Sequence, residues 1–170
     1  MSEIKDLQQA AAIEKLKELA EGIDICLFGS GSEDADGSSF RPMSTKLVDD
    51  EGIIYFLSDR NSEKNGEIQK DPRVKLFYAD PRKSSYLIIT GEAEISEDRE
   101  KIAELWSSLD KNWFKEGNDD PAISIIKVYP DNAHYWDTEG SRMVNFVKMI
   151  AGAATGRTLV KGQEGSLHLK

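Results

Sequence analysis

Apolar residues recur at helical spacing in two long stretches of the chain, and each stretch predicts an amphipathic helix. The first runs from about Glu3 to Glu21, ends near Gly22, and places near one face Ile4, Leu7, Ala11, Leu16 and Leu19. The second opens on the N-cap and acidic turn Ser96-Glu97-Asp98 and carries the stripe Ile102, Leu105, Trp106 and Leu109. Two further helices are expected, one over Ser62 to Lys70, closed by Asp71-Pro72, and one over Arg142 to about Ala154.

Short apolar or alternating runs predict strands between these helices. The strands are expected over Ile23–Phe28, Phe40–Val48, Ile53–Leu57, Arg73–Ala79, Ser85–Ile95, Ala122–Val128, Asn132–Thr138 and a short extended segment near Ser166–Leu169. Asp49-Asp50-Glu51-Gly52 predicts a hairpin turn, Gly91 marks a bulge or a close backbone approach, and the charged loop Lys111 to Pro121 is expected to be exposed. Short connections favour antiparallel pairing, so the pattern predicts a mainly β fold, an antiparallel barrel or sheet with three to four peripheral helices.

Length and composition predict one globular domain over residues 1–170, with the N-terminal helix at about 1–22 and a C-terminal helix and tail at about 142–170. The longest apolar runs, such as Met149 to Ala154, are far shorter than the ~18 residues of a membrane span. The charged start Met1 to Asp6 has no apolar signal core. The single cysteine, Cys26, lies in an apolar run and is expected to be a buried thiol. These features predict a cytoplasmic protein.

The formal net charge is −9, from 31 acidic and 22 basic residues. A surface of that sign repels nucleic acid and anionic membranes, so neither is expected as a partner. It would also repel a phosphorylated ligand, so a phosphate site requires a local cluster of cations and backbone N–H groups. The two histidines, His134 and His168, and the lone cysteine have no zinc-type spacing, so no metal site is expected.

One region brings basic residues next to a helix start. Arg41 and Lys46 lie on one predicted strand, and the strand that follows the hairpin leads into Ser62 and Lys64 in the first turn of a predicted helix. A helix start offers unsatisfied N–H groups and a positive dipole end to an anion, and an arginine adds a planar fork of donors. Arg41 and Lys46 are five residues apart and face opposite sides of a regular strand, so both meet one phosphate only if a bend intervenes, which Pro42 could provoke. On spacing alone, the favoured interpretation is that Ser62 is a simple N-cap and that the cations belong to a solvated surface.

The same segments carry a resemblance to a known family. In family order the chain has Arg41-Pro42-Met43-Ser44, then Phe56-Leu57-Ser58-Asp59 followed by Ser62 and Lys64, then Asp71-Pro72-Arg73-Val74, Tyr135-Trp136-Asp137 and the ending Gly162 to Leu167. This series resembles the pyridoxamine 5′-phosphate oxidase-like superfamily of FMN-binding split barrels, above all its general stress protein branch. The resemblance implies a split β-barrel homodimer that holds FMN, with FAD as the alternative flavin, between its subunits.

The resemblance also implies a role for each matching residue. Arg41, Ser62 and Lys64 match the phosphate-binding residues, and Lys46 matches a further lysine of the oxidases. Met43 and Ser44 match the backbone beside the flavin ring, and Leu57 and Ser58 match positions that touch the isoalloxazine. Trp136 matches a tryptophan contributed by the partner subunit, although a core or interface aromatic is an equal interpretation. Tyr86 stands where the oxidases have a glutamine, and we expect a structural role for it.

Two departures from the family pattern argue against pyridoxamine phosphate oxidation. Arg142 is present, but Val144 replaces the histidine of the oxidases and Phe146 replaces a flavin-binding arginine. A valine neither donates a hydrogen bond to a phosphate nor transfers a proton. The sequence leaves three alternatives: an FMN-dependent oxidoreductase of unidentified substrate, a flavin carrier or buffer without turnover, and a split barrel that binds haem or a deazaflavin. No residue is assigned as catalytic.

Overall fold

A computed structural model describes residues 3–4, 7–31, 40–138 and 162–169, and the statements below concern these residues. Its helices are α1 (Gln9–Ile23), α2 (Glu63–Lys70), α3 (Arg99–Leu105) and the 3-10 turns η1 (Ser108–Asn112) and η2 (Gly117–Asp119). Its strands are β1 (Glu3–Ile4), β2 (Leu7–Gln8), β3 (Ile25–Ser30), β4 (Phe40–Ser44), β5 (Leu47–Val48), β6 (Ile54–Asp59), β7 (Arg73–Asp80), β8 (Ser85–Ser96), β9 (Ile123–Thr138) and β10 (Gly162–His168).

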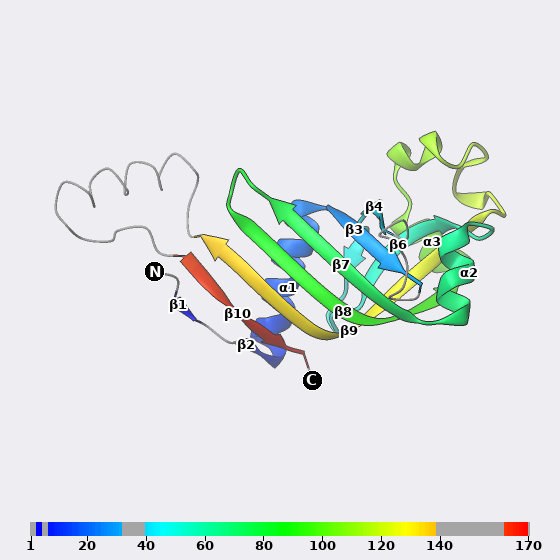
Figure 1. Cartoon of the computed structure of the whole chain (residues 1–170). Coiled ribbons are helices and arrows are strands. Elements are labelled where there is room, and N and C mark those ends of the chain that lie inside the picture. The colour runs from blue at the N-terminus through cyan, green and yellow to red at the C-terminus, as the bar shows by residue number, and fades with distance from the viewer. Residues whose placement is uncertain (1–2, 5–6, 32–39, 139–161, 170) are drawn as a thin grey trace.

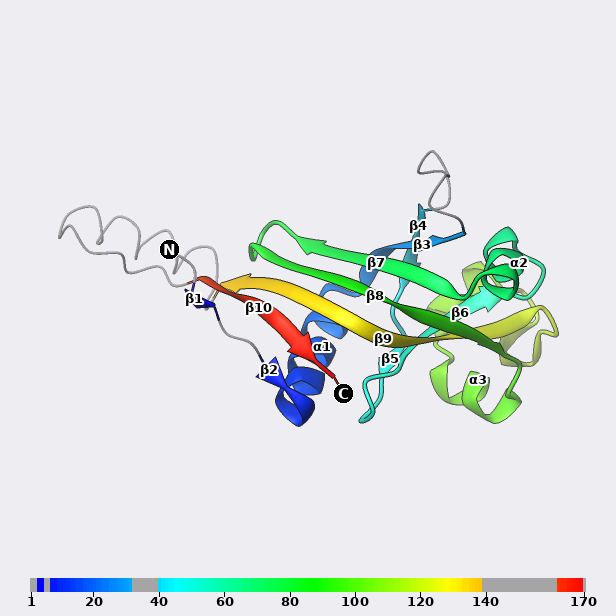
Figure 2. The same cartoon turned by 60° about the horizontal axis from the view of Figure 1, so that its bottom comes forward.

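The strands form one curled sheet in the order β1-β10-β9-β8-β7-β3-β4 (Figure 1). Pairing is antiparallel except where β1 and β2 add to β10. The long strand β9 pairs with β8 on one edge, and on its other edge with β6 along its first half and with β10 along its second half. Because two different strands continue the sheet from one edge of β9, the sheet curls into a half-barrel (Figure 2). The expected mainly antiparallel split barrel with peripheral helices is confirmed.

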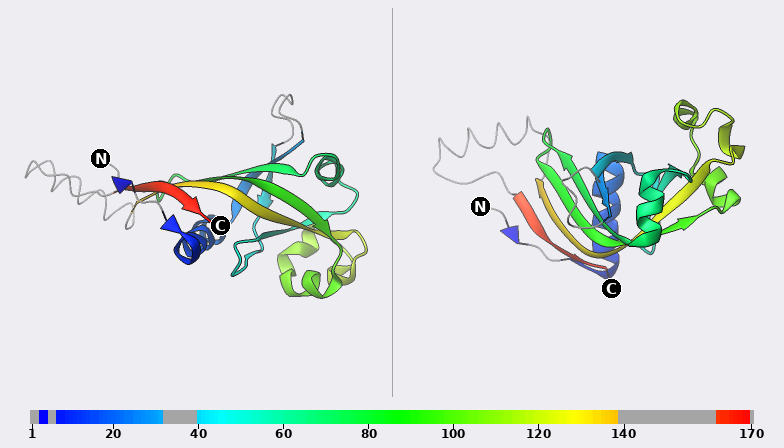
Figure 3. Two further views of the ribbon diagram at one scale, coloured as in Figure 1. Left: turned by 90° about the horizontal axis from the view of Figure 1, so that it is seen from below. Right: turned by 45° about the vertical axis from the view of Figure 1, so that its right-hand side comes forward.

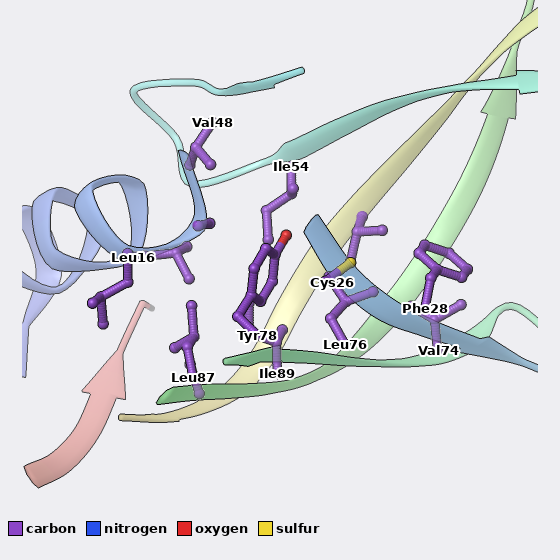
Figure 4. Close-up of a cluster of buried hydrophobic side chains, with 14 of the residues drawn as sticks. Leu16, Cys26, Phe28, Val48, Ile54, Val74, Leu76, Tyr78, Leu87 and Ile89 are labelled. Carbon is purple, nitrogen blue, oxygen red and sulfur yellow. The ribbon is translucent and has the colours of Figure 1, made fainter. Parts of the chain in front are cut away.

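The inner face of the sheet and α1 enclose the main core. Alternation places every second residue of β7 inside, where Val74, Leu76 and Tyr78 are buried. Leu16 of α1 points toward Leu87 of β8 in this cluster (Figure 4). Each such aliphatic side chain contributes about 1.5–3 kcal/mol by leaving water. α1 crosses the sheet at the end near β10, and α2 and α3 lie at the opposite end (Figure 3).

Cys26 of β3 lies in this core and is 1% exposed, which confirms the expected buried thiol. Burial raises the pKa of its thiol to about 12. The Cys26 thiol therefore stays protonated at neutral pH.

The two amphipathic helices predicted from the apolar spacing, α1 and α3, are both shorter than the pattern predicted. Residues Glu3–Ile4 and Leu7–Gln8 are strands, because they pair with β10, and α1 runs on past Gly22 to Ile23. Its buried face is Ala12, Leu16, Leu19 and Ala20, so the assignment of Ala11 to that face was wrong. The other helix, α3, ends at Leu105, and Leu109 is 74% exposed on η1 instead of inside the core.

Two strand boundaries also differ from the prediction. The pair of strands expected around Tyr129-Pro130 is the single strand β9, because a register shift at Thr90/Gly91 accommodates the proline opposite Gly91. A Cβ on Gly91 would lie 2.3 Å from the carbonyl oxygen of Tyr129, so the close backbone approach is confirmed. The strand expected over Phe40–Val48 breaks into β4 and β5. The helix expected from Arg142 to about Ala154 lies outside the described residues.

Candidate functional site

A cleft of about 570 Å³ opens where β4, β6, the start of α2 and the segment after η1 meet. It is lined by Ile25, Arg41, Pro42, Met43, Ser44, Lys46, Leu57, Ser58, Asp59, Lys64, Asp110, Trp113 and Phe114. This set includes seven of the nine residues that the sequence assigned to a cofactor, all except Ser62 and Trp136. The cleft combines cationic side chains with an apolar wall.

A break in the strand lets Arg41 and Lys46 line one cleft. After β4, the pairing of this segment with the β3 side ends at Thr45, whose amide donates to the Asp24 carbonyl at 3.1 Å. The next amide, that of Lys46, donates instead to the carbonyl of Tyr55 in β6 at 2.8 Å. The bend therefore lies at Thr45–Lys46, whereas Pro42 stays within β4, an edge strand in which its missing N–H is tolerated.

The guanidinium of Arg41 is held by a carboxylate and a hydroxyl. Its Nη1 donates to Glu67 Oε2 at 3.1 Å and to Ser30 Oγ at 2.6 Å, and Ser30 donates in turn to Glu67 at 2.6 Å. Burial opposes ionisation of Glu67, but the hydrogen bonds from Ser30 and Arg41 outweigh it and lower the pKa of this carboxyl. Glu67 is thus ionised at neutral pH and orients the Arg41 fork beside the cleft.

The two lysines of the cleft differ in their environment. Burial and the nearby Arg41 charge lower the pKa of Lys64 below its ordinary value. Lys46 instead forms an ion pair with Asp110, with Nζ 2.6 Å from the carboxylate. An anion bound near Lys64 would relieve the repulsion from Arg41, whereas an anion at Lys46 would compete with Asp110.

A buried polar network fixes α2 against the sheet beside the cleft. Asn65, 1% exposed, accepts from Ser58 Oγ at 2.8 Å and from Ser62 Oγ at 3.2 Å. Its amide nitrogen donates to Ser124 Oγ at 2.8 Å, and Ser124 donates to the Ser58 carbonyl. Ser62 is the N-cap residue, but its side chain makes no capping hydrogen bond, because the hydroxyl turns toward Asn65. Ser62 therefore does not line the cleft but is tied to Ser58, which does.

Trp136 and Tyr86 lie far from this cleft in the same chain. They are paired neighbours on β9 and β8, and their side chains are 36% and 39% exposed. Trp136 contacts the ring of His134, with 4.5 Å between ring centroids. Neither residue lines the cleft.

Among the residues of this site that sequence reasoning missed are Asn65, Glu67, Asp110, Trp113 and Phe114. Glu67 had a signal, since it lies three residues after Lys64 on a helix and so on the same face. Trp113 and Phe114 belong to the segment Lys111 to Pro121, which was expected to be an exposed charged loop. That expectation was wrong for Phe114, which is 7% exposed, and Asp110, just before this segment, is buried as well.

No helix among the described residues is both long and apolar enough to span a bilayer. No cluster of three or more histidine, cysteine, aspartate or glutamate side chains with metal-binding geometry occurs in that part of the chain. Arg142, Val144 and Phe146 lie outside it.

Comparison with known proteins places the chain among relatives of low sequence identity. It is 21% identical to Protein bli-3 of Neurospora crassa over 126 residues, which are 69% of this chain and 60% of that protein. The fold matches the crystal structure of a general stress protein 26 from Jannaschia sp. CCS1 with a TM-score of 0.79, at 22% identity over 94% of this chain and 99% of the other. It matches the general stress FMN/FAD binding protein of Xanthomonas citri with a TM-score of 0.63, at 19% identity over 76% of this chain and 90% of the other.

The sequence profile of one family covers most of the chain. It matches residues 11–160, a range that includes every residue of the cleft. The chain therefore belongs to the family described as pyridoxamine 5′-phosphate oxidase like.

Proposed function

We propose that the protein binds FMN in the cleft between β4, β6 and α2. Arg41 and, in the first turn of α2, Lys64 hold the phosphate, Ser62 supports this turn through Ser58 and Asn65, and Met43, Ser44, Leu57 and Ser58 lie along the flavin ring. The observation that carries this proposal is the meeting of Arg41 and Lys64 with an apolar wall in one cleft of an otherwise acidic protein. The family and the flavin named for the Xanthomonas citri protein support it.

The site fits a phosphate and a planar ring by its chemistry. Arg41 presents a fork of donors that Glu67 orients, and burial together with the nearby Arg41 charge lowers the pKa of Lys64, so an arriving anion would be stabilised by both cations. The dipole of α2 adds positive potential at the same end. FMN carries both a phosphate and a planar ring. FAD is the alternative ligand, and it requires space for its second nucleotide beyond that phosphate.

When bound, a flavin supplies redox chemistry, so we propose an oxidoreductase of unidentified substrate. Oxidation of pyridoxamine phosphate is not proposed, because Val144 and Phe146 replace the family's histidine and arginine. Anaerobic photoreduction followed by exposure to oxygen, NAD(P)H and candidate acceptors tests turnover. A bound flavin that reacts with none of them would identify the protein as a flavin carrier or buffer.

The outer face of the sheet supports a homodimer with the flavin between subunits. One row of residues crosses β4, β3, β7, β8 and β9 through the pairs Ser44–Ile25, Ala79–Tyr86 and Tyr86–Trp136. Four inter-strand spacings separate Ser44 from Trp136, roughly 19 Å, so one Trp136 does not reach its own cleft. Ile25 and Leu27 are 49% and 50% exposed on this face. A second copy would cover them and bring its own Trp136 to the cleft.

The absorption spectrum and mass of the co-purifying ligand test the proposal first, because flavin, haem and deazaflavin absorb differently. Titration with FMN then tests the site. We expect Arg41→Ala and Lys64→Ala each to weaken FMN binding by roughly 1.5–3 kcal/mol, the range of charged hydrogen bonds. Arg82→Ala, an exposed arginine in the turn after β7, is the control. If both cleft variants bind FMN as tightly as Arg82→Ala, the site assignment is wrong.

A further inference from the structure

Trp113 exposes a large aromatic side chain at the mouth of the cleft. It is 82% exposed, and it is nevertheless one of the residues that line the cleft. Leu109 on the same segment is 74% exposed and does not line the cleft. Exposure alone therefore does not distinguish Trp113; its place in the lining of the cleft does.

The backbone that carries Trp113 is held on both sides. Asp110 accepts from Lys46 Nζ at 2.7 Å and from the amide of Ser107 at 2.7 Å. The amides of Trp113 and Phe114 both donate to the Asp110 carbonyl at 2.9 Å. Phe114 is buried in a smaller hydrophobic cluster with Ile102, Leu105 and Ile125, and its ring centroid lies 6.4 Å from that of Trp106.

An indole on a fixed backbone is suited to stacking. Binding a ring to it costs little ordering, because the aromatic side chain has only two rotatable bonds and the segment is already anchored. The anchor is the ion pair of Lys46, a cation whose ammonium is engaged by a carboxylate that is only 9% exposed. Lys46 thus acts on the ligand through the position of Trp113.

We propose that Trp113 stacks on the planar ring of the ligand in the cleft, and that Lys46 and Asp110 are positioning residues for Trp113. The inference rests on the proposed function, in which that ring is the isoalloxazine of FMN. It gives Lys46 a role other than the phosphate contact that the family resemblance implies.

Titration with FMN and with riboflavin, which has the same ring and no phosphate, tests the stacking. Trp113→Ala should weaken the binding of both ligands about five- to tenfold, as loss of an aromatic stack does. Leu109→Ala, the control, should change neither, and Arg41→Ala should weaken FMN binding far more than riboflavin binding. Equal affinities for Trp113→Ala and Leu109→Ala would overturn the inference while leaving the proposed function intact. Wild-type protein that binds neither flavin would overturn both.

The positioning role has its own test. Lys46→Met should weaken FMN and riboflavin by the same factor and reduce the flavin-induced quenching of Trp113 fluorescence, measured as the difference between wild type and Trp113→Phe. Lys46→Arg should restore both, since it keeps the ion pair with Asp110 and preserves the fold. A loss in Lys46→Met that is confined to FMN would instead make Lys46 a phosphate ligand and overturn the positioning role.

Discussion

At the residue scale, the cleft is organised by partners of the cations rather than by the cations alone. Glu67 orients Arg41, Asp110 engages Lys46, and Lys64 is left with Arg41 as its strongest repulsive neighbour. Each cation therefore responds differently to an arriving anion. Arg41 is preorganised, Lys64 gains an opposite charge, and Lys46 is already paired.

The lowered pKa of Lys64 predicts a pH dependence of FMN binding. As pH rises through this pKa, which lies below the ordinary 10.5, the ammonium loses its proton and its attraction for the phosphate. The affinity of the wild type should thus fall at alkaline pH. Lys64→Arg keeps its charge over that range, so the ratio of wild-type Kd to variant Kd should rise with pH. A ratio that stays constant would contradict the assignment of Lys64 to the phosphate.

The buried amide of Asn65 predicts a cost for its removal. Asn65→Ala removes the acceptor of the Ser58 hydroxyl and the donor to Ser124 Oγ, and each buried polar group left unsatisfied costs about 1–3 kcal/mol. Urea denaturation should show this loss in the free energy of unfolding. Asn61→Ala, an exposed asparagine before the same helix, should change it little. An unfolding free energy equal in the two variants would show that the network is dispensable.

At the element scale, breaks in regular structure position the site. The strand break at Thr45–Lys46 turns the chain from β3 toward β6, and the register shift at Gly91 lets β9 continue past Pro130 to Trp136. A salt bridge between Lys15 and Asp137, 2.5 Å apart, ties α1 to the far end of β9. The strand break and the register shift bring distant segments to the cleft and to the outer face.

Two glycines offer a matched test of this view. Gly91→Ala would place a Cβ 2.3 Å from the Tyr129 carbonyl oxygen, so the strands must separate, and we expect a loss of about 1–3 kcal/mol. Gly66→Ala, inside α2, meets nothing within 4 Å and should stabilise the protein by about 0.5–1 kcal/mol. Thermal or urea denaturation measures both. Equal stability of Gly91→Ala and wild type would mean that the bulge does not depend on glycine.

At the scale of the whole molecule, the curled sheet has one filled face and one exposed apolar face. The inner face packs on α1, whereas the outer face presents Ile25, Leu27, Phe77, Tyr86 and Trp136. Large exposed apolar patches on a sheet mark an interaction surface. The proposed homodimer would cover it and complete the cleft.

Leu27→Glu tests the homodimer. A glutamate at the centre of the covered face would be buried without a partner, so the dimer dissociation constant should rise at least about 100-fold. Sedimentation velocity should then show a monomer, and FMN binding should weaken because the partner's Trp136 is lost. Leu109→Glu, on an exposed leucine outside this face, is the control. A wild type that sediments as a monomer, or a Leu27→Glu variant that remains a dimer, would exclude this interface.

Much of the architecture was predictable because local pattern and burial agree. The alternation of Val74, Leu76 and Tyr78, the hairpin before Ile54 and the helix after Ser62 all follow from neighbours in the chain. The helix ends were less predictable, since pairing of residues 3–4 and 7–8 with β10 depends on a segment more than 150 residues away. Long-range pairing overrides helical spacing because it satisfies the same backbone groups.

For the site, the sequence by itself determined that Ser62 and Lys64 stand in the first turn of a helix, that Arg41 lies on an earlier strand and that the chain shares a family's motifs. Only the tertiary structure decided which cations line one cleft. The bend arises because the amide of Thr45 donates to Asp24, before β3, whereas the next amide, that of Lys46, donates to Tyr55 of β6. The tertiary structure also decided that Lys46 pairs with Asp110 and that Trp113 stands at the mouth of the cleft. The contact between Lys46 and Asp110 joins residues 64 positions apart, and no local pattern encodes it.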